Sequence, residues 1–259
     1  MARRALLVLV LPLVLAGCGG GGEGSDQIAL AASKTAKVGS IEADFTVSGA
    51  GVEGRGTGVF NTGAKGSGQL TMTVGAGGRN FKIDTVITGT VLYMRSPVFA
   101  QITGGKQWVK LDLGKIARQR GINLGSLLNT SPTPTSALAY LRGSGGKVKK
   151  VGTEQVQGVD TTHYRVTVDL ERAAARAKGA ARDSLKRVIQ LSGVKKVPVE
   201  VWIDGKDYVR KVVYQTNGGR GQAARVTMEL HDFGPRVPIK PPPKDSVVDL
   251  MSRLGGGSG

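Results

Sequence analysis

The sequence predicts an α+β domain built on a strongly curved antiparallel sheet, an open half-barrel of about 8 to 11 strands with helices packed on its concave side. Two observations lead to this prediction. Apolar residues recur at every second position in many short segments, as in half-buried strands. Turn signals separate these segments at intervals of about 8 to 14 residues, so that most strands pair with their neighbours in sequence.

The first half of the chain contains a helix and then a series of strands. Ser25 and Asp26 are placed to cap a helix from Gln27 to about Val38. From Ile41 the apolar period changes to two, which indicates the first strand. The same alternation predicts four further strands, at about 69–74, 81–87, 90–96 and 107–113.

Glycine is enriched between the first two of these strands. The segment GAGVEGRGTGVFN covers residues 49–61, and more glycines follow it. Glycine in strands permits the kinks that a coiled sheet needs, but the same residues are also typical of exposed loops. The sequence leaves both interpretations open for Gly54, Gly56, Gly58, Gly66 and Gly68.

The second half begins with helical signals and returns to strands. Short helices are expected around Leu124–Leu128 and Ser136–Arg142, and a long amphipathic helix is expected from Glu171 to Leu191. This helix is rich in Arg and Ala, and its basic side could lie on an anionic membrane or the helix could cover the concave face. Strands are expected at 147–156, 159–170, 198–204, 208–216 and 224–233.

The amino terminus is typical of a bacterial lipoprotein. Arg3 and Arg4 precede the apolar run from Ala5 to Ala16, which is too short to span a bilayer, and Leu15-Ala16-Gly17-Cys18 resembles a lipobox. We expect a diacylglyceryl group on Cys18, the only cysteine; the alternative is an ordinary signal peptide with an incidental cysteine. The predicted divisions are a signal peptide (1–17), an acylated Cys with a Gly-rich tether (18–26), one domain (27–244), and a short helix with a flexible tail (245–259).

The charge is strongly positive, +17 for the whole chain and +15 without the two arginines of the signal peptide. Export and the lack of aromatics interleaved with the basic residues argue against nucleic acid. Anionic phospholipids or cell-wall polyanions are the expected counter-charge, and a merely solvated basic surface is an equal alternative.

No motif for catalysis or metal binding stands out. Residues 49–54 match GxGxxG, but a dinucleotide site needs a helix next and RGTGVFN forms turns and strands instead. His163 and His231 lie on predicted strands, opposite the apolar stripe, and no metal-ligand spacing surrounds them, so surface or edge positions are expected. Trp108 and Trp202 are expected to anchor strands. We therefore expect no enzyme, no cofactor and no metal.

Four strings together resemble one family: the lipobox, GTEQVQGVDTTHYRVTVDL, VPVEVWID and MELHDFGPRV. They are similar to the actinobacterial LppX/LprG (LprAFG) lipoproteins, which have a LolA/LolB-like fold. Cys18 matches the anchor, Thr161, Thr162 and Tyr164 match the strand after the GxE turn, and Val199, Val201 and Trp202 match VxVWID. The long helix Glu171–Leu191 departs from many members.

The resemblance implies a membrane-anchored protein on the extracytoplasmic face that binds acyl chains of a diacyl lipid or lipoglycan in an apolar cavity and carries it within the envelope. An envelope transporter is a candidate partner, and we expect a monomer. The alternative is a lipid-anchored interaction, scaffold or sensor module with a filled core. Which residues of 208–216 face inward is open, with Val209 and Val213 competing against Tyr208, Val212 and Tyr214. The candidate cavity residues, each of which could instead be plain core, are Phe45, Val47, Leu70, Met72, Phe81, Ile83, Leu92, Met94, Tyr164, Val166, Val168, Val199, Val201, Met228 and Leu230.

Overall fold

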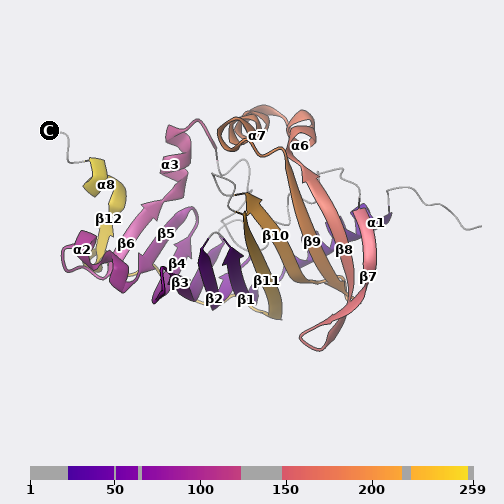
Figure 1. The fold of residues 1–259 in the computed structure, drawn as a ribbon, viewed down its shortest axis with the longest axis horizontal. Helices are drawn as coiled ribbons and strands as arrows, with labels where there is room; N and C mark the ends of the chain where they lie inside the picture. The colour runs from indigo at the N-terminus through magenta and orange to yellow at the C-terminus, as the bar shows by residue number, and fades with distance from the viewer. Residues whose placement is uncertain (1–22, 50, 64–65, 124–147, 218–222, 256–259) are drawn as a thin grey trace, which may run out of the picture.

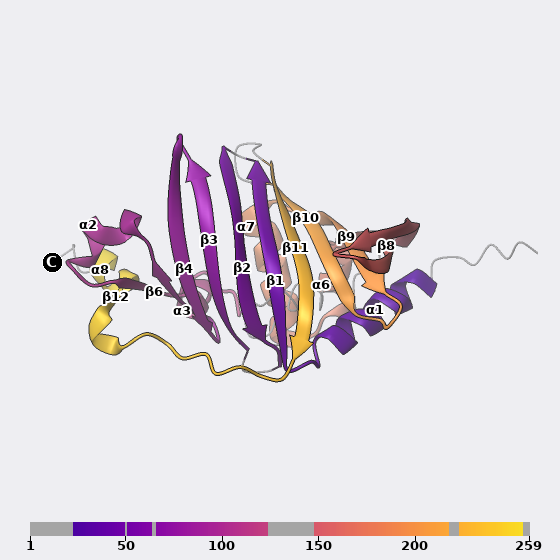
Figure 2. The same cartoon turned by 90° about the horizontal axis from the view of Figure 1, so that it is seen from below.

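A computed structural model describes residues 23–49, 51–63, 66–123, 148–217 and 223–255. Its centre is one twelve-stranded sheet, in the order β12-β6-β5-β4-β3-β2-β1-β11-β10-β9-β8-β7. All neighbouring strands are antiparallel except β12, which lies parallel to β6. The sheet is curved and open (Figures 1 and 2), which confirms the predicted fold class, with one strand more than the expected upper number. The strands are β1 (Ser40–Gly49), β2 (Val52–Asn61), β3 (Ser67–Ala76), β4 (Arg79–Thr88), β5 (Val91–Arg95), β6 (Trp108–Asp112), β7 (Val148–Val156), β8 (Val159–Asp169), β9 (Lys196–Asp204), β10 (Val209–Asn217), β11 (Ala223–Gly234) and β12 (Val247–Asp249).

The sheet consists of two meanders joined edge to edge. Strands β1 to β6 pair in chain order, and β7 to β11 do the same. The join is the antiparallel pair of β1 with β11, in which Phe45 lies opposite Met228 and Val47 opposite Val226. Strand β11 thus brings the end of the second meander back to the start of the first.

Helices lie at the ends and on the concave side of the sheet (Figure 2). The helix α1 contacts β7, β9 and β10, and α6 contacts β8, β9 and α7. The helices and single turns are α1 (Glu23–Thr35), η1 (Pro97–Phe99), α2 (Ala100–Thr103), α3 (Leu113–Gln119), α6 (Leu170–Arg176), α7 (Gly179–Ser192), η4 (Lys244–Ser246) and α8 (Leu250–Gly255).

The first helix begins earlier than the sequence predicts. Because α1 starts at Glu23 and ends at Thr35, Ser25 and Asp26 lie within it and do not cap it. Its buried residues Ile28, Ala31 and Ala32 belong to the main core. The two small alanines let the helix backbone approach the sheet closely, and the Thr35 hydroxyl accepts a hydrogen bond from the buried Val209 N–H (2.9 Å).

The predicted single helix from Glu171 to Leu191 is wrong, because two helices occupy this segment. Ala177 and Lys178 have extended backbones, and Gly179 has a φ of +52°. A left-handed glycine is incompatible with a continuous right-handed helix, so the chain turns between α6 and α7. Two aspartates at strand ends cap the flanking helices: Asp112 accepts from the Lys115 N–H at α3, and Asp169 accepts from the Arg172 N–H at α6.

Two further segments differ from expectation. The glycine-rich stretch after β1 is strand β2, which pairs along its whole length with β1 and β3, so the loop interpretation is wrong for Gly54, Gly56 and Gly58. The carboxyl-terminal segment, expected to form only a helix and a tail, first adds β12 to the sheet through Val247–Asp249 and then forms α8. The helices predicted within 124–147 lie outside the described residues.

Candidate functional site

The register of the strands aligns apolar side chains into rows on the inner face of the sheet. One row passes from Phe45 through Met228, Val212 and Val201 to Tyr164. In the other direction the same row continues from Phe45 through Gly56 and Met72 to Ile83. All fifteen candidate cavity residues lie on this face. In residues 208–216 the inner face takes members of both competing sets: Val212 and Tyr214 pair with inner-face residues, and Val209, on the other side of a register shift, is also buried in the main core, whereas Val213 packs with Trp202 on the outer face.

The candidates nevertheless fall into groups with different surroundings. Six are buried and belong to the main core cluster, which also contains Ile28, Ala31 and Ala32 of α1: Val166, Val168, Val199, Val201, Met228 and Leu230. Four are half-buried and pack against that core: Phe45, Leu70, Leu92 and Tyr164. Five are half-buried and lie outside the core cluster: Val47, Met72, Phe81, Ile83 and Met94. The six buried residues thus form the core against the second meander. The five residues outside the core leave apolar surface partly exposed on the first meander.

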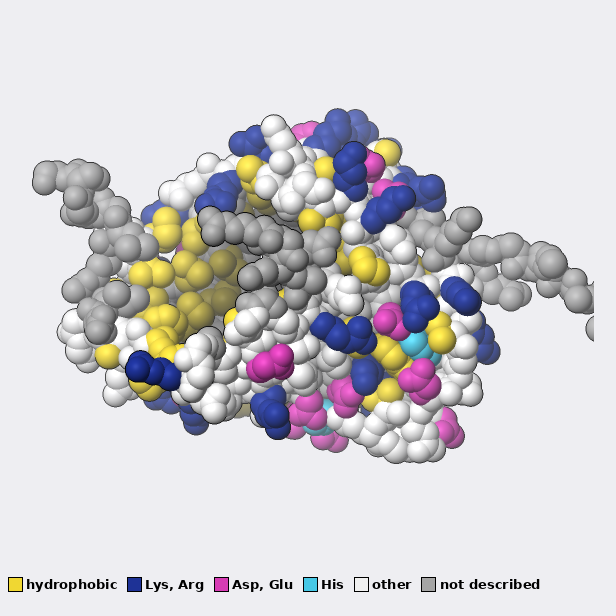
Figure 3. All heavy atoms as spheres, viewed as in Figure 1, with side chains coloured by type: hydrophobic (Ala, Val, Ile, Leu, Met, Phe, Trp, Pro, Cys, Tyr) yellow, Lys and Arg dark blue, Asp and Glu magenta, His cyan; other side chains and the backbone are white. Residues whose placement is uncertain are grey.

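The concave side of the first meander is hollowed (Figure 3). Figure 3, which has the same view as Figure 1, shows hydrophobic side chains gathered in a concave area over the first meander, next to β4 and β5 and below α3. On the described residues of the second meander, α1 covers the equivalent inner face. The structure therefore offers one partly exposed apolar surface on the concave side of the sheet.

Glycines on β2 create room in this part of the sheet. A Cβ at Gly56 would overlap the Thr71 carbonyl oxygen and lie 2.7 Å from the Met72 Cα, a distance that real Cβ atoms essentially never show. The flanking aromatic rings of Phe45 and Phe60 pack edge to face, with centroids 5.5 Å apart. Glycines therefore let Met72 of β3 approach the β2 backbone at Gly56 and let the Phe60 ring lie over Gly58 and Gly68.

Burial shapes the chemistry of two tyrosines on the inner face. Burial raises the pKa of Tyr214 and, despite an opposing hydrogen bond with Thr162, that of Tyr164. Both phenols therefore stay neutral at ordinary pH, and the inner face of the second meander remains uncharged at these positions.

Helices α3, α6 and α7 lie along one side of the hollow (Figures 1 and 3). The end of α3 and the residues after it are tied to the middle of α7: the Arg187 Nε donates to the Arg120 carbonyl (3.0 Å), and the Asn123 N–H donates to the buried Ser184 hydroxyl (3.0 Å). Because α6 rests on β8 and β9, these contacts connect the far ends of the two meanders across the concave side.

The outer face of the second meander carries a polar cluster that the sequence did not predict. His163 stacks on Trp202 at 4.0 Å, and its two ring nitrogens lie 2.9 Å from Glu154 and 2.8 Å from Glu200. Hydrogen bonds from Trp202 and then from His163 lower the pKa of Glu154. His163 is only 5% exposed, so the expectation of a surface position is wrong, although its face of the strand is as predicted. The missed signal is that Glu154 and Glu200 lie on the two strands beside it.

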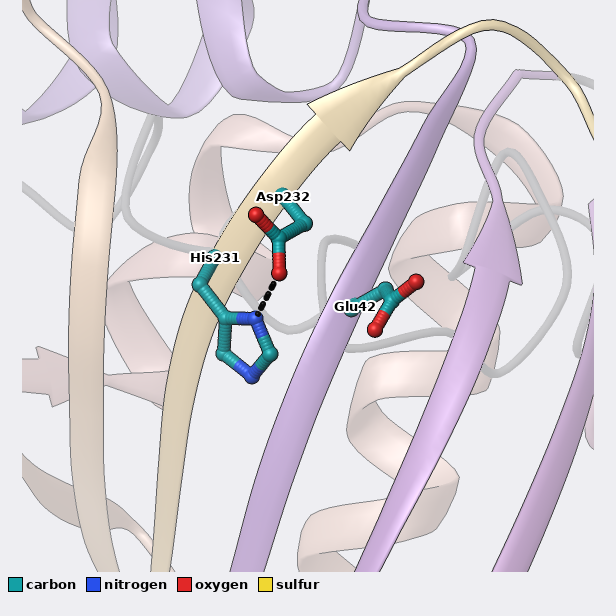
Figure 4. A group of neighbouring side chains, drawn as sticks. All are labelled: Glu42, His231 and Asp232. Atoms are coloured by element: carbon teal, nitrogen blue, oxygen red, sulfur yellow. Dashed lines mark hydrogen bonds and ion pairs between the residues drawn. The ribbon is translucent and has the colours of Figure 1, made fainter.

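A second group on the outer face brings together possible metal ligands. Glu42, His231 and Asp232 place ligand atoms within 4.8 Å of one another (Figure 4). The extra residue in β11 here and the positive φ of Asp232 (+46°) turn Asp232 toward the same side as His231. The ring nitrogens of His231 already have partners, Asp232 at 2.8 Å and Asp44 at 3.4 Å. The arrangement therefore serves as a network of polar contacts between β1 and β11.

The remaining candidates are placed as follows. The GxGxxG match lies in the hairpin from β1 to β2, with no helix after it in residues 51–61, so the dinucleotide interpretation has no structural basis. Trp202 anchors β9 and Trp108 lies half-buried under Arg95, 4.9 Å from the ring centre. Cys18 and the lipobox lie outside the described residues. None of the helices in the described part of the chain is long and apolar enough to cross a membrane.

The sequence is similar to a curated protein over part of its length. No family model matches the chain. An uncharacterized 31.2 kDa protein encoded in the rplA–rplJ intergenic region of Streptomyces griseus is 32% identical over 161 residues, 60% of this chain. The chain spans about half (52%) of the length of that curated relative.

Solved structures of similar shape are more informative about the architecture. LprF from Mycobacterium bovis is similar over 85% of this chain and 97% of its own, with a TM-score of 0.52 and 14% identity. The Mycobacterium tuberculosis lipoprotein LppX is similar over 83% of this chain and 96% of its own, with a TM-score of 0.51 and 13% identity. The chain therefore has the fold of LprF and of the lipoprotein LppX, as its resemblance to the LppX/LprG lipoproteins implied.

Proposed function

We propose that this chain is a lipoprotein of the cell envelope that holds the acyl chains of a diacyl lipid or lipoglycan against the open inner face of β2 to β6 and carries the lipid within the envelope. The supporting observation is that apolar residues on the same inner face of the sheet are buried to different extents in its two meanders. Five apolar residues of the first meander are half-buried and lie outside the core cluster, on the side of the sheet where Figure 3 shows a hollow, whereas six of the candidates on the second meander are buried in the main core.

The energetics favour a hydrocarbon ligand for such a surface. Each methylene left in water costs about 0.8 kcal/mol, so a lipid leaves the bilayer only if a protein supplies comparable apolar contact. These five residues lie on four strands of the first meander, β1, β3, β4 and β5, with only β2 between β1 and β3, and together they form a surface long enough for extended chains. Few charged groups point inward there, because Lys82, Asp84 and Arg95 alternate to the outer face.

The anchor belongs to the same proposal. Acylation of Cys18 would supply two chains and hold the domain at the extracytoplasmic face of the membrane. We expect Cys18→Ala to release the protein from membrane fractions washed at high salt, which screens charge-based binding; unchanged retention under that wash would contradict the anchor without affecting the lipid-binding surface.

Native mass spectrometry of the chain from residue 23, which contains all of the described fold, tests the carriage of lipid. We expect extra mass in the range of a diacyl lipid that disappears after extraction with organic solvent. Met72→Asn, on the inner face, should reduce the lipid-bound fraction several-fold, while Thr73→Asn, next to it on the outer face of β3, should not. A lipid-free mass in every preparation from a lipid-containing host would overturn the proposal and favour a scaffold with no cargo.

A further inference from the structure

A basic surface borders the hollow. Three helical segments, α3 with the residues after it, α6, and α7 with the residue before it, contain nine cationic and two anionic side chains. All nine cations are exposed. We call this set the basic rim, and it consists of Lys115, Arg118, Arg120, Arg172, Arg176, Lys178, Arg182, Lys186 and Arg187.

The rim is one surface in space. Helices α6 and α7 pack on each other, and α7 is joined to the end of α3 through the hydrogen bonds of Arg187 and Ser184. In Figure 3 dark blue side chains gather over α6, α7 and α3, above the apolar hollow. Most carboxylates of the described chain lie elsewhere, many of them on the outer face of the sheet, where they pair with basic residues, as Glu200 and Glu229 do.

The helix α7 keeps charges that its own stability does not favour. Arg182 and Lys186 are four residues apart, a spacing at which like charges repel on a helix. Lys178 precedes the first turn, where the helix macrodipole is positive, and this turn has no acidic residue and no side-chain cap. Such an arrangement is slightly unfavourable in an isolated domain and becomes favourable when an anionic surface lies against it.

An apolar group accompanies these cations. Leu191, near the end of α7, is 50% exposed, and Val188 and Ile189 beside it are half-buried. Basic residues together with an exposed apolar side chain match the interface of an anionic bilayer, where cations meet headgroups and apolar groups reach the acyl boundary.

We propose that the basic rim docks on an anionic phospholipid bilayer and so brings the hollow to the membrane surface. The docking can be tested without the proposed function. It rests on that function only for its biological role, which would be to bring the hollow next to the membrane from which acyl chains are taken up. The sequence left open whether the segment Glu171–Leu191 covers the sheet or lies on a membrane. In this proposal it does both, because α6 rests on the sheet while the exposed side of α7 faces the membrane.

Vesicle sedimentation with the chain from residue 23 tests the docking. We expect binding to phosphatidylglycerol vesicles, little binding to phosphatidylcholine vesicles, and weaker binding at higher salt because of screening. Since each basic residue near an anionic surface contributes about fivefold in affinity, the double variant R182Q/K186Q should bind on the order of 25-fold more weakly.

The matched control removes the same charge from the other side of the molecule. Arg55→Gln with Lys149→Gln changes two exposed outer-face residues on β2 and β7 and should leave vesicle binding within about twofold, because the charges are far from the docked surface. Circular dichroism should confirm that both double variants fold. Equal binding to the two kinds of vesicle, or equal loss in both double variants, would overturn the proposal.

Single-cysteine labelling gives an independent readout of orientation. The chain from residue 23 has no cysteine, so Leu191→Cys and Thr57→Cys each provide one attachment site for an environment-sensitive dye. Phosphatidylglycerol vesicles should shift the emission of the dye at 191 to shorter wavelength and leave the dye at 57, on the outer face of β2, unchanged. The same shift at both positions would contradict docking through the rim.

These experiments separate the two proposals. A domain that binds phosphatidylglycerol vesicles through the rim but never retains lipid would refute carriage and keep the docking surface. A domain that retains lipid but binds both kinds of vesicle equally would refute the docking surface and keep carriage.

Discussion

The two meanders of the sheet have the same alternation of apolar and polar residues, but their apolar faces are buried to different extents. On the second meander, β7 to β11, the inner face meets α1, and residues such as Val201 (0% exposed) and Leu230 (1%) are fully packed. On the first, β1 to β6, Val47, Met72, Phe81, Ile83 and Met94 are half-buried and lie outside the core cluster, although Ile87 (6% exposed) belongs to that cluster. The comparison teaches that the pattern of a strand specifies which side is apolar, and the placement of one helix decides whether that side becomes core or binding surface.

The largest effect should come from truncating a methionine in the packed meander. Met228 lies 5% exposed between Phe45 and Val212, so Met228→Ala removes fully buried atoms and leaves a cavity. We expect the free energy of unfolding to fall by about 2–5 kcal/mol, measured by urea denaturation. A loss below about 1 kcal/mol would show that this meander is not packed and would remove the contrast.

The second effect concerns the helix that closes the packed meander. Thr35→Val keeps the shape of the side chain but removes the acceptor for the buried Val209 N–H. An unsatisfied buried donor costs about 1–3 kcal/mol, and the amide of Val209 should exchange faster with deuterium. Thr35→Ser, which keeps the hydroxyl, should retain slow exchange; fast exchange in both variants would mean that the hydrogen bond does not hold α1 in place.

Much of this architecture follows from sequence because alternation is local. The rows through Phe45, Met72 and Ile83 could be placed on one face from spacing alone. The position of α1 over the second meander could not be predicted in this way, since its contacts with β9 and β10 join residues that are far apart in the chain. Similarly, His163 is indistinguishable from a surface histidine until β7 and β9 bring Glu154 and Glu200 beside it.

The structural role of glycine was the hardest to predict from the sequence. In β2 it makes room for neighbouring side chains on a regular strand, while Gly179 with a positive φ divides what reads as one amphipathic helix. Both uses depend on neighbours or backbone angles that residue type alone does not specify. The strand β12 was missed for a different reason, because three residues are too short to show alternation.

A third, smaller effect is expected from the matched methionine of the open meander. Met94 is half-buried between Thr85 and Val109 and lies outside the core cluster, so Met94→Ala removes less buried area than Met228→Ala. We expect a loss of unfolding free energy below about 1 kcal/mol by urea denaturation, together with a lower fraction of lipid-bound protein in native mass spectra. A loss as large as that of Met228→Ala would show that both meanders are core.

The smallest effect is pH-dependent and belongs to the outer face of the packed meander. Because Trp202 and His163 lower the pKa of Glu154, its carboxylate stabilises the fold above its ordinary pKa of 4.5, and this contribution is lost as pH falls through the lowered value. Glu154→Gln should therefore lower the urea midpoint slightly at pH 7, and the difference from the unmodified chain should shrink in acid. Glu53→Gln removes the same charge from the outer face of the open meander and should change neither. If the two variants respond alike, the polar cluster around His163 contributes nothing specific, and the two meanders differ only on their inner face.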